Sequence, residues 1–209
     1  MGSLEWTKLN PIEIFGVITG IIYVFLEIRQ NIWLWPVGIA TSAVYVYVFF
    51  ISKFYADMSL QVYYLLVSCA GWYWWVRGTG QKTPGSGRGG EDAIVEGNGR
   101  LRVTRLKLRT GLFLSAVFVA LYFLVWLVLS RLTDSPVPEW DSLITSLSVI
   151  ATWMLARKIF EHWYLWVVVN LISVIIFSTR ELYPTVILYL VYLTMSFAGL
   201  RSWRKSLSG

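Results

Sequence analysis

The chain has 209 residues, of which 56% are hydrophobic and only 14% are charged, and its formal net charge is +6. A soluble domain of this length needs more polar surface, so the expected solvent is the lipid bilayer. The basic residues flank apolar runs and form no separate polar domain, which excludes a nucleic-acid-binding protein. The single cysteine, Cys69, excludes a disulfide framework.

Seven apolar runs predict seven transmembrane helices, each close to the ~20 residues that a bilayer span requires. The first run lacks the basic start and the cleavage site of a signal peptide, so we expect it to be retained. Pro36 and Pro184 fall in first turns, where a residue without an N–H group is tolerated. In chain order, the predicted spans are 12–28, 33–51, 58–76, 111–129, 141–156, 163–178 and 184–201.

Two parts of the chain resemble each other. The string NIWLWPVGI at 31–39 matches HWYLWVVVN at 162–170, which pairs Trp35 with Trp166, and 55–75 can be laid on 183–203. Each copy holds three predicted spans, so a direct connection would invert one copy, and the fourth span restores its direction. We therefore predict an all-α membrane protein with a 3+1+3 plan, in which a connector helix joins two parallel three-helix repeats, as in the SWEET sugar carriers.

The predicted division is a first repeat over 1–76, a cytoplasmic connector over 77–110, a connector helix over 111–129, and a second repeat with a cytoplasmic tail over 130–209. Eight of the sixteen glycines fall between 78 and 99, followed by the basic string RLRVTRLKLR, which we expect to lie on an anionic membrane surface.

The Lys and Arg residues are distributed unequally about the spans: four fall on the side of the membrane where the N-terminus lies, and fourteen fall on the other side. This excess predicts an external N-terminus and a cytoplasmic C-terminus.

The sixth span carries the strongest binding signal. Trp163, Trp166 and Asn170 share one helical face, so two indoles could hold a flat cationic ring while the amide bonds a carboxamide or hydroxyls. Alternatively, the tryptophans are interfacial belt residues and Asn170 bonds a neighbouring helix. The other candidates are aromatic or polar residues at corresponding depths in both halves: Trp35, Gln61, Tyr64, Ser68, Tyr189, Tyr192 and Ser196.

The titratable side chains are few. Glu13 and Glu27 lie near the ends of their spans, so no carboxylate falls at mid-membrane, and transport without ion coupling is predicted. We expect Glu27 to pair with Arg29 at the surface; in the alternative, its carboxylate draws a cation toward a cavity. One His and one Cys cannot build a zinc site, and no phosphate-binding loop is present, so no metal, cofactor or ATP hydrolysis is expected.

The tryptophans that end the third span are interpreted as belt residues: Trp72, Trp74 and Trp75.

The strings LEIRQNIWLWPVGI, FYADMSLQVYYL, GWYWW, WYLWVVVN and RELYPTVILYLVYL resemble the PnuC family of vitamin transporters, over about residues 12–76 and 157–203. The family pattern W-x-x-W-x-x-x-N/D falls on Trp163, Trp166 and Asn170. The resemblance implies a homotrimer in the bacterial plasma membrane that mediates facilitated diffusion of nicotinamide riboside, which a cytoplasmic kinase then traps. Relatives that carry thiamine or riboflavin leave these vitamins open as substrates.

The leading hypothesis is therefore a uniporter whose helices rock around a central cavity. Two other classes stay open. An intramembrane enzyme would need a nucleophile or a metal cluster, which this inventory does not supply. A non-transporting membrane subunit or sensor would bind a ligand without moving it.

Overall fold

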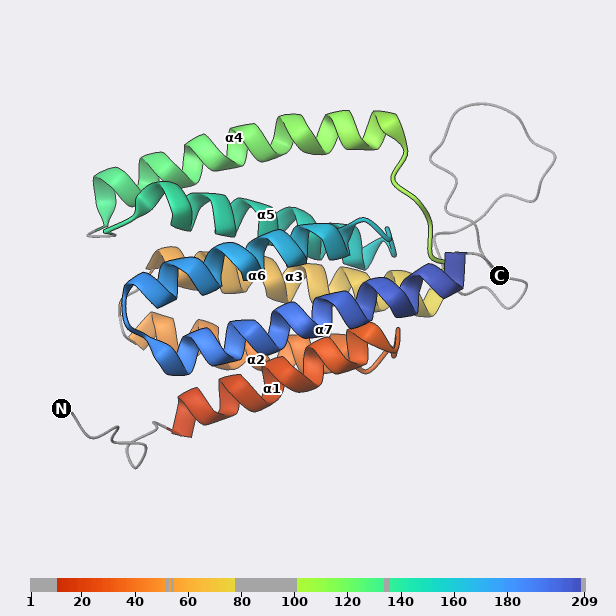
Figure 1. Ribbon diagram of the computed structural model, residues 1–209, viewed down its shortest axis with the longest axis horizontal. Coiled ribbons are helices and arrows are strands. Elements are labelled where there is room, and N and C mark those ends of the chain that lie inside the picture. The colour runs from red at the N-terminus through yellow and green to blue at the C-terminus, as the bar shows by residue number, and fades with distance from the viewer. Residues whose placement is uncertain (1–10, 52, 54, 78–100, 134–135, 208–209) are drawn as a thin grey trace.

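The computed structural model describes residues 11–51, 53, 55–77, 101–133 and 136–207, which form seven α-helices (Figure 1). Each predicted span corresponds to one helix, and the ends agree within three residues except in α7, which continues six residues further. The predicted all-α class with seven helices is confirmed. The helices are α1 (Pro11–Ile28), α2 (Leu34–Ile51), α3 (Tyr55–Arg77), α4 (Leu108–Leu132), α5 (Pro138–Ala156), α6 (His162–Thr179) and α7 (Tyr183–Leu207).

Six of these helices close into a ring. Contacts run from α1 to α2, from α2 to α3, from α3 to α5, from α5 to α6, from α6 to α7, and from α7 back to α1. Among the described helices, α4 packs on α5 alone and lies at the rim of the bundle (Figure 1). The ring therefore joins α1–α3 to α5–α7 at two seams, one between α3 and α5 and one between α7 and α1.

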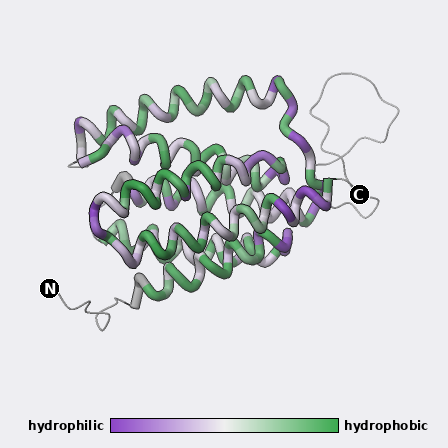
Figure 2. The backbone as a smooth tube through the Cα atoms, in the orientation of Figure 1, coloured by the Kyte–Doolittle hydropathy of each residue, from purple (hydrophilic) through white to green (hydrophobic). Residues whose placement is uncertain are grey.

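The helices differ in hydropathy according to what surrounds them. In the described part of the chain, α2, α4, α6 and α7 are long and apolar enough to cross a bilayer, and α1 adds a shorter apolar stretch. Helix α5 is more polar, but it contacts three other helices and buries Ser142, Ser146 and Ser148. Its hydroxyls thus face protein instead of lipid. In Figure 2 the hydrophobic residues run along the helices, and hydrophilic residues gather at the helix ends.

The turns between helices repeat along the chain. Positive φ angles are uncommon outside glycine, and four such residues are present among those described. Each lies two residues beyond the end of a helix, and they form two pairs whose members are 128 positions apart. The backbone therefore makes matching turns after α1 and α5, and after α2 and α6. The pairs are Gln30 with Lys158 and Lys53 with Glu181.

The packing of two tryptophans follows the same spacing and corrects one sequence pairing. Gly71 lies against the indole of Trp35, and Gly199, 128 positions later, lies against the same three ring carbons of Trp163. A Cβ atom at either glycine would overlap the ring. Trp35 therefore corresponds to Trp163, and its predicted pairing with Trp166 is wrong. The alignment of 31–39 with 162–170 placed tryptophan on tryptophan, and it was therefore shifted by three residues from the spacing of 128 that the structure shows.

A buried tryptophan closes each seam of the ring. Trp75 Nε1 donates to the backbone oxygen of Ala156 at 3.3 Å, and Trp203 Nε1 donates to that of Glu27 at 3.0 Å. Trp75 is 5% exposed and Trp203 is fully buried, so the belt interpretation is wrong for Trp75, whereas Trp72 is 44% exposed. The burial of Trp203 also explains why α7 extends beyond its predicted end.

The last part of the predicted connector, residues 101–107, packs against the turn between α5 and α6. Thr104 N donates to Lys158 O at 3.0 Å, and Phe160 N donates to Thr104 O at 2.9 Å. Leu101 is 3% exposed and belongs to the hydrophobic core. The glycine-rich stretch 78–99 lies outside the described residues, and the division into two repeats stays a prediction.

Candidate functional site

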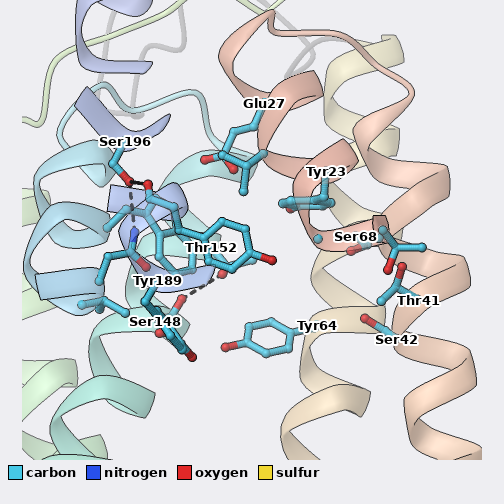
Figure 3. A pocket seen from close by; sticks show the side chains of 18 of the residues that line it. Tyr23, Glu27, Thr41, Ser42, Tyr64, Ser68, Ser148, Thr152, Tyr189 and Ser196 are labelled. Carbon is cyan, nitrogen blue, oxygen red and sulfur yellow. Dashed lines mark hydrogen bonds between the residues drawn. The ribbon is translucent and has the colours of Figure 1, made fainter. Parts of the chain in front are cut away.

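A cavity of about 340 Å³ lies inside the ring, within the size range of small-molecule sites. All six ring helices contribute to its lining, and the peripheral helix α4 does not. Figure 3 shows side chains from α1–α3 facing side chains from α5–α7 across this space. The two halves of the bundle therefore enclose the cavity together.

The lining of α2 and α3 corresponds to the lining of α6 and α7. Six positions of α2 and α3 each have a counterpart 128 positions later, and all twelve line the cavity. Equivalent backbone positions thus carry different side chains toward one space. The pairs are Gly38 with Trp166, Thr41 with Val169, Ser42 with Asn170, Gln61 with Tyr189, Tyr64 with Tyr192, and Ser68 with Ser196.

Nine of the ten residues that the sequence predicts to bind substrate line this cavity. The exception is Trp35, which is fully buried, packs edge-on against Trp75 with ring centroids 5.4 Å apart, and lies outside the lining. Contact of the other nine with a substrate stays a prediction. They are Gln61, Tyr64, Ser68, Trp163, Trp166, Asn170, Tyr189, Tyr192 and Ser196.

Asn170 links α6 to α7 while it faces the cavity. Its Nδ2 donates to Ser196 Oγ at 3.1 Å, and Ser196 Oγ donates to Tyr192 O at 2.8 Å. The helix-to-helix bond that was the alternative for Asn170 is therefore present. An amide offers two donor hydrogens and an acceptor oxygen, so this one bond leaves Asn170 with capacity for a ligand.

Three buried polar atoms of the lining have no hydrogen-bond partner among the described residues. They are Trp163 Nε1, Trp166 Nε1 and Thr41 Oγ1. Buried polar groups in folded proteins are almost always bonded. The lining residues of both halves therefore retain hydrogen-bonding capacity that a polar molecule, a ligand or water, could satisfy.

Glu27 is the largest difference between the sequence prediction and the structure. The expected surface pair with Arg29 is wrong, because Glu27 is 2% exposed and lines the cavity, whereas the Arg29 guanidinium lies 4.6 Å from the Phe25 ring centroid. The Glu27 carboxylate instead contacts His162, with Oε1 3.1 Å from Nε2. The ring brings the last turn of α1 beside the first residue of α6, although 135 positions separate the two in sequence.

Sequence reasoning also missed several hydroxyl side chains, most of them small. These residues carry no motif, and their helical spacing looks like that of ordinary packing residues. A constant spacing of 128 positions across the whole chain would have identified part of this set from its counterparts. The missed lining residues include Thr19, Tyr23, Thr41, Ser42, Ser148 and Thr152.

Within the described ranges, no group of three His, Cys, Asp or Glu side chains gathers, so nothing there offers a metal centre.

A ring of apolar helices around a cavity lined by aromatic and polar side chains defines a multi-pass membrane carrier for a small solute. The model of the nicotinamide mononucleotide transporter family matches residues 10–205, and the chain belongs to that family. The resemblance to the PnuC transporters is thereby confirmed. The relatives found are transporters, so nothing among them supports the alternative of an intramembrane enzyme.

Similar proteins cover nearly the whole chain. The nicotinamide riboside transporter PnuC of Escherichia coli (strain K12) is 28% identical over 95% of this chain and 87% of its own. The riboflavin/roseoflavin transporter RibM of Streptomyces davaonensis is 26% identical over 91% of this chain and 83% of its own. The crystal structure of the vitamin B3 transporter PnuC superposes with a TM-score of 0.68 at 22% identity, covering 94% of this chain and 82% of that one. This structural likeness establishes the shared fold.

Proposed function

We propose that this chain is a bacterial plasma-membrane carrier for nicotinamide riboside. The cavity inside the ring carries this proposal, because it has the size of a vitamin site and because lining residues of both halves hold polar atoms without a hydrogen-bond partner in the described part of the chain. Family membership and the PnuC relatives support the choice of substrate. Nicotinamide riboside has a flat cationic ring, a carboxamide and ribose hydroxyls, and each of these finds a matching group in the lining.

The sixth helix would hold the pyridinium ring. The Trp166 indole provides an aromatic face, and stacking with a cation there contributes about 1–2 kcal/mol. The amides of Asn170 and Gln61 would bond the carboxamide and hydroxyls, and Tyr64 and Tyr189 would provide further hydroxyl contacts. Trp35 would act indirectly, by packing against Gly71 behind the lining.

Transport would proceed by rocking of α1–α3 against α5–α7 around the cavity, as two parallel repeats. The paired turns and the paired lining residues support the two-repeat plan. Movement would be concentrated at the two seams, which Trp75 and Trp203 bridge. Net uptake would be facilitated diffusion, and a cytoplasmic kinase would keep the product inside the cell.

The orientation and assembly belong to the same proposal. The excess of Lys and Arg on one side supports a cytoplasmic C-terminus and an external N-terminus. We infer a homotrimer from the family resemblance. The broad exposure of large apolar side chains on α4, among them Leu108, Leu112 and Phe113, suits contact with lipid or with neighbouring copies.

A second substrate has support from one relative. The similarity to RibM favours riboflavin as the alternative, and thiamine, another cationic aromatic, would meet the same indoles and amides. A competition experiment separates these vitamins, since each would occupy the same cavity.

The test is counterflow in sealed proteoliposomes. Vesicles loaded with unlabelled nicotinamide riboside and diluted into labelled nicotinamide riboside are expected to accumulate label transiently, without an ion gradient or ATP. External thiamine or riboflavin would reduce this signal only if it binds the cavity. Absence of counterflow with all three vitamins, from protein that unfolds cooperatively on heating, would refute the proposal.

A further inference from the structure

Among the described residues that line the cavity, Glu27 is the single acidic or basic side chain of the Asp, Glu, Lys, Arg and His types. It lies in the last turn of α1, and only 2% of it is exposed. Figure 3 shows its carboxylate turned into the space between the two halves. An isolated carboxylate in such a place is unfavourable unless it is paired or meets a cation.

His162 holds this carboxylate in place. Its Nδ1 lies 2.7 Å from Ile159 O, and because a carbonyl oxygen can only accept, Nδ1 carries a hydrogen and donates it. Its Nε2 lies 3.1 Å from Glu27 Oε1, so one further proton occupies that contact. With this proton on Nε2, the pair is an imidazolium and a carboxylate, and the carboxylate is the partner that lines the cavity.

Packing fixes the imidazole on both sides. The His162 ring centroid lies 4.8 Å from that of Trp163 and 4.7 Å from that of Trp203, and His162 is fully buried. Trp203 also donates to the backbone oxygen of Glu27. Both members of the pair are therefore held rigidly, which is the condition for a charge to act on a bound ligand at small reorganisation cost.

The other half of the molecule has an apolar pair at the corresponding positions. The residues 128 positions from Glu27 and His162 are Leu155 and Leu34, and both are fully buried. Buried ion pairs seldom stabilise a protein more than well-packed apolar residues of similar volume do. Stability alone therefore gives no reason for an acid–base pair here, and its contact with the cavity points to the substrate.

We propose that Glu27, positioned by His162, selects the charge of the substrate and favours a positively charged aromatic ring over a neutral ring of the same shape. The inference rests on the proposed function, because it concerns the same cavity. The carboxylate end of the Glu27–His162 pair faces the cavity, and it attracts a cation more strongly there, at low dielectric constant, than it would in water. Trp166 would determine the shape of the accepted ring, and Glu27 would determine its charge.

The test compares nicotinamide riboside with its 1,4-dihydro form, which keeps the carboxamide and the ribose but has an uncharged ring. Binding of each to the purified full chain is measured by titration calorimetry. In Glu27→Gln, the Kd for nicotinamide riboside is expected to rise about tenfold or more, while that for the dihydro form changes by less than about threefold. Glutamine keeps the shape and can still bond His162, so a purely structural role of Glu27 would affect both ligands equally.

Two further variants complete the experiment. Glu161→Gln removes a neighbouring carboxylate whose Oε2 accepts a hydrogen bond from Leu106 N at 2.8 Å and which lies outside the cavity lining. It is expected to leave both dissociation constants unchanged. The double variant Glu27→Leu with His162→Leu copies the other half, so it is expected to fold, to bind the dihydro form and to lose the preference for the cation.

The possible outcomes separate the two proposals. Loss of preference for the cation in Glu27→Gln or in the double variant supports charge selection. An unchanged preference in either folded variant, or an equal loss for both ligands, overturns charge selection and leaves the proposed function standing. If the unaltered chain binds neither ligand, the proposed function fails, and charge selection fails with it.

Discussion

The two halves of the ring share a backbone plan and differ at the positions that face the cavity. Ser68 and Ser196 are the same residue type at matched positions, as are Tyr64 and Tyr192. Gly38, however, corresponds to the much larger Trp166. The matched positions thus share their backbone turns and seams, and under the proposed function the positions that differ would provide recognition.

The divergence in size is largest between α2 and α6. The second half contributes an indole and an amide, from Trp166 and Asn170, where the first half has Gly38 and Ser42. A flat ligand can then lie against α6 while α2 leaves room for it. The asymmetry predicts that matched substitutions in the two halves have unequal effects on binding and similar effects on stability.

The largest expected effect comes from removing the aromatic wall. Trp166→Ala should weaken binding of nicotinamide riboside by about 2–4 kcal/mol, because truncation of a tryptophan at the centre of a binding site commonly costs that much. The measurement is titration calorimetry. The matched control is Trp33→Ala, which truncates a tryptophan that is 65% exposed and lies outside the cavity lining. Equal dissociation constants for the two variants would remove Trp166 from the site.

The glycine–tryptophan contacts test whether the halves are equivalent in packing. Gly71→Ala and Gly199→Ala should each lower the free energy of unfolding by about 1–3 kcal/mol, because the new methyl group overlaps an indole. Only Gly199→Ala should also weaken binding, since its partner Trp163 lines the cavity and Trp35 does not. Thermal unfolding and calorimetry measure the two effects. Gly111→Ala, whose new Cβ would lie 3.4 Å from the nearest atom of Leu106, an ordinary van der Waals contact, is the control for stability.

The amide position tests the asymmetry directly. Asn170→Ala should weaken binding by about 1–3 kcal/mol, because hydrogen bonds to a desolvated ligand are lost. Ser42→Ala, at the corresponding position of α2, should cost less than about 1 kcal/mol. Dissociation constants from the same titration settle the comparison. A larger loss for Ser42→Ala would reverse the assignment of the two walls.

The smallest expected effect lies at the seams. Trp75→Phe and Trp203→Phe each remove one indole hydrogen bond to a backbone oxygen of the other half. Each should lower the free energy of unfolding by about 0.5–1.5 kcal/mol, measured by denaturant titration in detergent. A loss in only one variant would mean that the seams are not equivalent.

Apolar runs were sufficient to predict the helices. Bilayer spans require long hydrophobic segments, so seven runs gave seven helices with small errors at their ends. The end of α7 was missed because Trp203 is buried by residues that are distant in sequence, His162 and Trp163, and a local pattern carries no sign of this.

The site was predicted where side chains are distinctive and missed where they are small. Tryptophans, tyrosines and amides in apolar runs identified nine lining residues, whereas hydroxyls such as Thr41 and Ser148 do not differ in pattern from packing residues. Glu27 was misassigned because Arg29 is its neighbour in sequence and His162 is its neighbour in space. Only the closure of the ring brings α1 and α6 together at this point.

The most direct test of the central claim is an experimental structure of the protein with nicotinamide riboside bound. The account predicts density for the ligand inside the ring, with the pyridinium ring against Trp166, the carboxamide or ribose within hydrogen-bond distance of Asn170, and Glu27 nearby. Ligand density outside the ring, or in the separate pocket that α4, α5 and the start of α6 line, with an empty central cavity, would contradict it.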